Sequence, residues 1–101
     1  NISLRIDTEQ ETAEIGYTAN ANYHRKGYAT EAALALKELV QKMPGIKTFL
    51  AHTTKPNLAS QGVLEKIGMT LMWEKEGLSL RGEPTIRLRY ESKLNNDAKK
   101  T

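Results

Sequence analysis

The chain has 101 residues, enough for a single domain with a hydrophobic core. Without cysteine it has no disulfide, thiolate metal ligand or cysteine nucleophile, which suits a reducing cytoplasm. Two histidines are too few for a convincing zinc site, so no metal is expected, and no apolar run approaches a membrane span. The net charge of +3 is a mild bias toward anionic partners.

Two alternating stretches at the start of the chain predict strands. Apolar and polar residues alternate over 2–6 and again over 13–19, with a polar turn over 7–11 between them. We expect these two strands to form an antiparallel hairpin. A loop should follow over 20–26.

The period then changes to that of a helix. Apolar residues fall at helical spacing over 27–43, and Pro44-Gly45 should end the helix. A compact apolar run over 46–53 predicts a strand. A second helix should open at Pro56-Asn57, with Asn57 as its N-cap and Gly68 as the left-handed residue after its last turn.

The last third of the chain predicts two antiparallel strands. They cover 69–75 and 86–91, with turns expected at Gly77 and over 81–84. The domain should occupy 1–92, and 93–101 should form a polar tail. The order β-β-α-β-α-β-β predicts an α/β fold with a mixed sheet, whose central strand–helix–strand unit joins parallel strands.

The most informative segment lies where the second strand gives way to the first helix. Gly27 and the small Ala29 leave room at the start of the helix, and Arg25 and Lys26 add positive charge there. Free N–H groups of a first helical turn favour a phosphate or pyrophosphate. The alternative is that Gly27 only lets the chain turn and that both cations are solvated.

Two motifs in this chain resemble those of one enzyme family. His24-Arg25-Lys26-Gly27-Tyr28-Ala29 is similar to motif A of the GNAT N-acetyltransferases, Gln/Arg-x-x-Gly-x-Gly/Ala. Residues 57–69 resemble Asn-x-x-Ser-x-x-Val-Leu-Glu-Lys-x-Gly-Phe of the ribosomal-protein N-terminal acetyltransferase branch. His24 departs from the first motif, and we expect it to weaken the pyrophosphate contact without abolishing it.

The resemblance implies the GNAT, or acyl-CoA N-acyltransferase, fold and acetyl-CoA as acetyl donor. The donor would lie between splayed parallel strands over 13–19 and 47–53, with its pyrophosphate on the turn over 25–30. Asn57 would bond the pantetheine arm, although helix capping alone would also explain it. The implied cofactor-binding residues are Tyr17, Thr18, Ala19, His24, Arg25, Lys26, Gly27, Tyr28, Ala29, Thr30 and Asn57.

Direct attack of an amine on the thioester needs a base, an oxyanion donor and a proton for the leaving thiolate. A backbone N–H over 17–19 is the implied oxyanion donor. Leu64 stands where many members have a tyrosine acid, so Ser60 is the candidate acid, or else an ordinary polar residue of a first helical turn. Glu14 is the candidate base, acting through water, or else a solvent-facing strand residue.

Other residues have weaker claims to catalysis. Glu74 and Glu76 are secondary candidates for the base, and a lone histidine in an apolar run, His52, is more often a core residue. We expect Trp73 and Tyr90 to be packing residues.

The resulting hypothesis is an N-acetyltransferase acting on a protein N-terminal α-amine, for example of a ribosomal protein, or on a small amine. A CoA-binding module without turnover is the alternative, and a nucleic-acid-binding domain is disfavoured by the lack of interleaved basic and aromatic residues. Complete family members begin with a strand and two helices that this sequence lacks. We therefore expect an exposed apolar sheet edge over 2–6, covered by a second copy in a homodimer.

Overall fold

The computed structural model describes residues 2–17, 26–79 and 81–94. Within these residues the chain forms the elements expected from the sequence, in the expected order. They are β1 (Ile2–Asp7), β2 (Thr12–Tyr17), α1 (Lys26–Gln41), β3 (Thr48–Thr54), α2 (Leu58–Lys66), β4 (Thr70–Leu78) and β5 (Pro84–Lys93).

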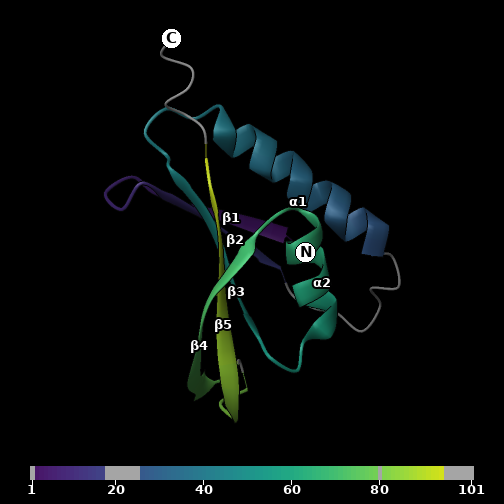
Figure 1. Ribbon diagram of the computed structural model, residues 1–101. Coiled ribbons are helices and arrows are strands. Elements are labelled where there is room, and N and C mark those ends of the chain that lie inside the picture. The colour runs from purple at the N-terminus through teal and green to yellow at the C-terminus, as the bar shows by residue number, and fades with distance from the viewer. Residues whose placement is uncertain (1, 18–25, 80, 95–101) are drawn as a thin grey trace.

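The strands form one mixed sheet in the order β1-β2-β3-β5-β4 (Figure 1). β1 and β2 pair antiparallel, as do β3 with β5 and β4 with β5. β2 and β3, which α1 connects, pair parallel. These pairings confirm the predicted hairpin, the parallel strand–helix–strand unit and the antiparallel final pair.

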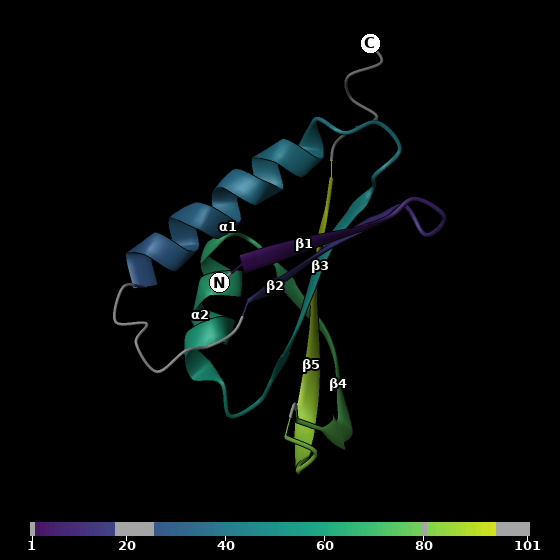
Figure 2. The same cartoon turned by 180° about the vertical axis from the view of Figure 1, so that it is seen from behind.

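Both helices cover the same face of the sheet, as the views from front and back show (Figures 1 and 2). The core lies between them and that face, and its largest fully buried side chains are those of Phe49, Ile15, Leu64 and Val40. Strand residues alternate between faces, so their neighbours in the sequence point to the opposite side. We call that opposite side the open face; it carries Arg5, Glu14, His52, Trp73 and Arg89.

The ends of α2 confirm two predictions made from single residues. The Asn57 side chain accepts a hydrogen bond from the backbone N–H of Ser60 at 3.1 Å, which is an N-cap. At the other end Gly68 has φ +89°, and its N–H donates to the carbonyl of Glu65 while Met69 N–H donates to that of Leu64. These two bonds define a Schellman motif, which needs a left-handed residue and therefore favours glycine.

Two expectations about the C-terminal third were wrong. Gly77 does not turn the chain but lies inside β4, opposite Thr85 of β5. Lys93 belongs to β5 and Leu94 is buried in the core, so the packed part of the chain runs past the expected boundary at 92. A Leu94 N–H bond to the Lys47 carbonyl at 2.9 Å fixes that end of the strand. Residues 95–101 lie outside the described part.

Candidate active site

The parallel pairing of β2 with β3 is short. Its register runs from Thr12 opposite Thr48 to Ile15 opposite Ala51, although β2 continues to Tyr17 and β3 to Thr54. Beyond this point β2 stays paired with β1, and β3 with β5. Beyond the last pair, the facing edges of these two strands therefore carry backbone N–H and C=O groups. Within the described residues these groups are not bonded to one another. An extended ligand can pair with such groups as an added strand does.

A groove of about 110 Å³ opens along the length of α2, next to the N-terminal part of α1. It is largely apolar, and Leu58 at its rim has 73% of its surface exposed. Gly62 forms part of the floor, and a Cβ there would have no atom within 4 Å. The lining residues are Thr30, Leu58, Ala59, Gly62, Val63 and Lys66. Lys66 adds a cation to this groove beside those named from the sequence at the start of α1.

The predicted phosphate-binding turn is described only in part. Thr18, Ala19, His24 and Arg25 lie outside the described residues. Lys26, Gly27 and Tyr28 form the first turn of α1, and Ala29 and Thr30, both half-buried, follow in the next turn. Thr30 belongs to both the predicted turn and the groove, so the start of α1 and the groove are continuous.

Ser60 is a buried polar residue in the first turn of α2, with 6% of its surface exposed. Its backbone N–H is the donor to the capping Asn57. The capping interpretation of Asn57 is thus confirmed, while its contact with a pantetheine arm stays a prediction. Ser60 and Asn57 both follow directly from β3, on the helix-covered side of the sheet.

On the open face Glu14 and His52 are joined by a hydrogen bond. His52 Nδ1 lies 2.8 Å from Glu14 Oε2, and the two side chains are 23% and 28% exposed. Glu14 comes one residue before the last β2–β3 pair and His52 one residue after it. The pair therefore stands where the two strands part. The sequence placed His52 in the core and did not link it to Glu14, because the register between parallel strands is not encoded by either strand alone.

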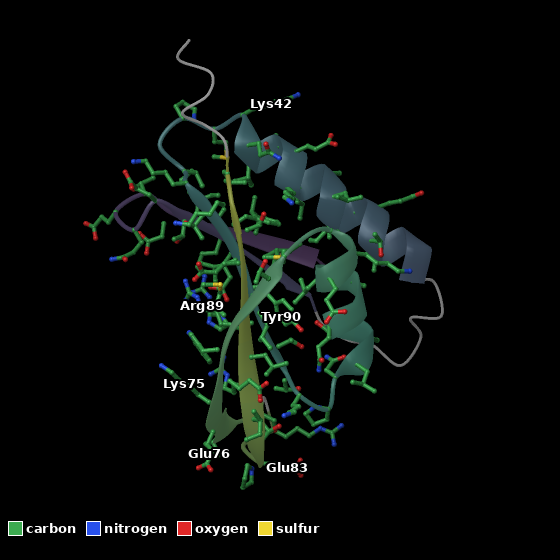
Figure 3. The ribbon with its side chains drawn as sticks, in the orientation of Figure 1. Lys42, Lys75, Glu76, Glu83, Arg89 and Tyr90 are labelled. Carbon is green, nitrogen blue, oxygen red and sulfur yellow. The ribbon has the colours of Figure 1, made fainter. Side chains whose placement is uncertain are left out.

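Other charged and aromatic side chains surround this pair. The Trp73 ring lies 5.8 Å from the His52 ring, and Lys75 Nζ lies 4.6 Å from the Trp73 centroid. Arg89, opposite His52 on β5, is bonded to Glu91 at 2.6 Å. Figure 3 shows Lys75 and Arg89 on the open face and Tyr90 on the helix side. Trp73 thus belongs to the open face and not to the core.

The two secondary candidates for the base lie apart from this pair. Glu74 is paired with Lys55 at 3.0 Å. Glu76 is exposed near the end of the β4–β5 hairpin, well away from Arg89 (Figure 3). Neither contacts Glu14 or His52, so neither belongs to this pair, and the catalytic role of all three carboxylates stays a prediction.

Tyr90 is a core residue, as predicted, but its hydroxyl contacts a charged side chain. It donates to Glu65 Oε2 at 3.5 Å. Burial, followed by the nearby Glu65 carboxylate, raises the pKa of the Tyr90 phenol above its usual value of 10.0. The phenol is therefore a structural group that stays protonated.

No helix in the described ranges is long and apolar enough to cross a membrane. The same residues hold no group of three histidine, aspartate or glutamate side chains that could bind a metal ion.

The family described as "Acetyltransferase (GNAT) domain" matches residues 2–70, which is most of the chain. The chain belongs to this acetyltransferase family. Its fold is also that of solved family members. RimL, a ribosomal L7/L12 alpha-N-protein acetyltransferase solved with coenzyme A, superimposes with a TM-score of 0.82 at 21% identity, over 95% of this chain and 55% of RimL.

Two further relatives agree with this assignment. The microcin C7 self-immunity acetyltransferase MccE, solved with acetyl-CoA and AMP, has a TM-score of 0.77 at 28% identity, over 88% of this chain and 50% of MccE. YnaD of Bacillus subtilis (strain 168), an uncharacterized N-acetyltransferase, is 42% identical over 60 residues, which is 59% of this chain and 35% of YnaD. The chain thus spans about half the length of these solved structures and about a third of YnaD.

Proposed function

We propose that this protein is an acetyl-CoA-dependent N-acetyltransferase that moves an acetyl group to a primary amine, either a protein N-terminal α-amine or a small amine. The observation that carries the proposal is the early end of the β2–β3 ladder at Ile15 and Ala51. It leaves backbone donors and acceptors for an extended acyl-pantetheine arm inside the sheet, next to the hydrogen-bonded Glu14 and His52. Family membership supplies the reaction class.

The proposed donor site runs from the sheet to the helices. The pantetheine arm would pair with β2 near Tyr17 and Thr18, and Asn57 would bond it from the other side. The pyrophosphate would sit at the start of α1, where unpaired N–H groups and the helix dipole favour anions. The groove floored by Gly62 continues from there, and Lys66 at its wall offers a cation to the phosphates.

The acetyl transfer follows from these positions. The amine nitrogen attacks the thioester carbonyl, the new C–N bond forms, and the C–S bond breaks with its electron pair on sulfur. A backbone N–H over 17–19 would stabilise the oxyanion. A thiol has a pKa of about 8.5, so a weak donor suffices for the thiolate, and Ser60 is the proposed donor. The Glu14–His52 pair supplies the proton acceptor on the open face.

The groove offers a direct test of donor binding. Gly62→Leu should place a side chain in the open space above Gly62 and abolish acetyl-CoA binding measured by calorimetry, with thermal stability retained. Ala35→Leu adds similar bulk on the exposed side of α1 and should bind acetyl-CoA like the wild type. Normal binding by Gly62→Leu would remove the groove from the site.

A second candidate function is a CoA-binding module without turnover. Leu64, at the position where many members carry the tyrosine acid, is 0% exposed and packs in the core, so it contributes no proton donor. Release of free CoA on adding N-terminal peptides, polyamines or aminoglycosides distinguishes the two candidates. Binding of acetyl-CoA without release in every case would favour the module.

We also propose where the protein is located and how it assembles. The first is a cytoplasmic location, which a chain without cysteine suits. The second is a homodimer formed along β1, an edge strand whose outer side pairs with no described strand. Light scattering tests the dimer, and a monomer at all concentrations would contradict it.

A further inference from the structure

Each oxygen of the Glu14 carboxylate has a neighbour of its own. Oε2 bonds the imidazole of His52 at 2.8 Å, and Oε1 faces the Arg5 guanidinium, across the β1–β2 pair, at 3.6 Å. The Oε2 lone pair that faces His52 is therefore occupied by that hydrogen bond. The role of proton acceptor therefore falls more naturally to the partner that still offers a lone pair.

His52 is that partner. An ionised carboxylate can only accept hydrogen bonds, so His52 Nδ1 carries the proton and donates it to Glu14. The lone pair then lies on Nε2, which has no hydrogen-bond partner among the described residues. This is the arrangement in which a carboxylate orients an imidazole and fixes its tautomer for use as a general base.

The position of His52 suits that role. It lies one residue beyond the last β2–β3 pair, on the open face, opposite the side that α1 and α2 cover. With 23% of its side chain exposed, His52 is open to an amine that approaches from that face, whereas Ser60 lies on the helix side of the same strands. The proposed base and the proposed acid therefore stand on opposite sides of the place where the strands part.

The charges facing His52 come from four strands. Glu14 on β2 contacts it, and Arg5 on β1 contacts Glu14. Arg89 on β5 lies opposite His52 but is neutralised by Glu91. On β4 the ring of Trp73 packs against the imidazole, with Lys75 over the far part of that ring. The Glu14 carboxylate, which contacts the imidazole directly, therefore dominates the electrostatic field there.

We propose that His52 is the general base of the acetyl transfer and that Glu14 is a positioning residue that holds its tautomer. This inference rests on the proposed function and refines it. His52 Nε2 takes one proton from the acceptor ammonium, which leaves the nitrogen lone pair free to attack the thioester. The nitrogen loses a second proton as the amide forms, the thiolate takes one proton to become CoA thiol, and the other passes from His52 to solvent.

The tautomer is tested without turnover by nitrogen-15 NMR. The chain has only two histidines, so the imidazole signals that disappear in His52→Gln belong to His52. Wild-type protein should show the proton on Nδ1. Glu14→Gln should raise the fraction with the proton on Nε2, because an amide can donate to Nδ1. A wild-type His52 with its proton on Nε2 would overturn the pairing.

Kinetics tests the catalytic role. With a peptide bearing a free N-terminus, spermidine and kanamycin as probes, His52→Gln should lower kcat about 100-fold or more. Glu14→Gln should lower it at least about tenfold, with KM for acetyl-CoA within about twofold of wild type. Glu83→Gln, an exposed carboxylate in the β4–β5 turn, is the matched control and should change neither.

The failures can be told apart. Wild-type turnover with an unimpaired His52→Gln overturns the role of His52 alone and returns the base to Glu14. Acetyl-CoA binding by the wild type without turnover of any probe overturns the proposed activity, and with it the catalytic role. The Glu14–His52 proposal is also overturned if two results occur together. These are a loss of kcat in His52→Gln that is explained by a loss of thermal stability, and an NMR tautomer that Glu14→Gln leaves unchanged.

Discussion

Lys37 of α1 donates a hydrogen bond from Nζ to the carbonyl of Ile67, at the end of α2, at 2.8 Å. A cation at this place meets the negative end of the α2 dipole and satisfies a carbonyl that the helix leaves unpaired. One side chain thus joins the two helices that border the proposed donor groove.

Lys37→Met removes this bond but keeps most of the aliphatic stem. We expect a loss of about 1–2 kcal/mol in the free energy of unfolding, since hydrogen bonds to charged groups are stronger than neutral ones. Lys42, which points away from the fold just after α1, gives the matched control Lys42→Met (Figure 3). Urea denaturation measures the free energy of unfolding of both variants, and equal values would contradict the capping role.

Gly68→Ala tests the left-handed residue that ends α2. At φ +89° an alanine is strained, and we expect a loss of about 1 kcal/mol. The space itself is adequate, because the nearest atom to the added Cβ is Lys37 Nζ at 3.4 Å. Gly62→Ala, inside α2, should instead raise stability by about 0.5–1 kcal/mol. Thermal denaturation of the pair should show opposite signs.

Tyr90→Phe tests the protonated phenol in the core. Because the folded-state pKa of Tyr90 is raised, the unfolded chain loses the phenolic proton first as pH rises above about 10. The unfolded state then binds fewer protons, so wild-type stability must fall with pH in that range. The phenylalanine variant lacks this dependence. Urea unfolding of both proteins between pH 8 and 11 should show the wild type losing stability relative to the variant, and parallel curves would contradict the shift.

Asn57 has a confirmed capping role and a proposed binding role, and two variants separate them. Asn57→Ala should cost about 1 kcal/mol, because the Ser60 N–H loses its acceptor. Asn57→Asp keeps the cap and should leave stability nearly unchanged, but it replaces an amide donor by a carboxylate and should weaken acetyl-CoA binding. Calorimetry on the aspartate variant decides the point, since wild-type affinity would leave only the cap.

The fold was largely predictable because its signals are local. Alternation marked the hairpin, helical spacing marked α1, and the cap at Asn57 and the glycine at 68 marked both ends of α2. The errors occurred where tertiary pairing overrode local preference. Gly77 has turn chemistry, yet the long β4–β5 ladder carries it as a strand residue, and Leu94 was hidden at the end of a polar stretch.

The site was less predictable, because its central contact joins residues 38 positions apart. Glu14 and His52 meet only through the parallel register of their strands, and neither residue signals that register. The groove beside Gly62 likewise depends on how α1 crosses α2. Motif resemblance named residues for the proposed donor site but did not reveal which side chains face one another on the open face.

The sheet can be viewed as two antiparallel units, the β1–β2 hairpin and the three strands β3, β5 and β4, joined by a seam of four residue pairs between β2 and β3. A ligand lying along that seam would touch both units at once and would bind only the assembled state. Ligand binding should therefore stabilise the packing of the two units against each other by the full free energy that binding to the assembled state supplies. Amide exchange at Gly16 and His52, on opposite sides of the seam, should then slow together when acetyl-CoA is present, although the two residues belong to separate antiparallel units.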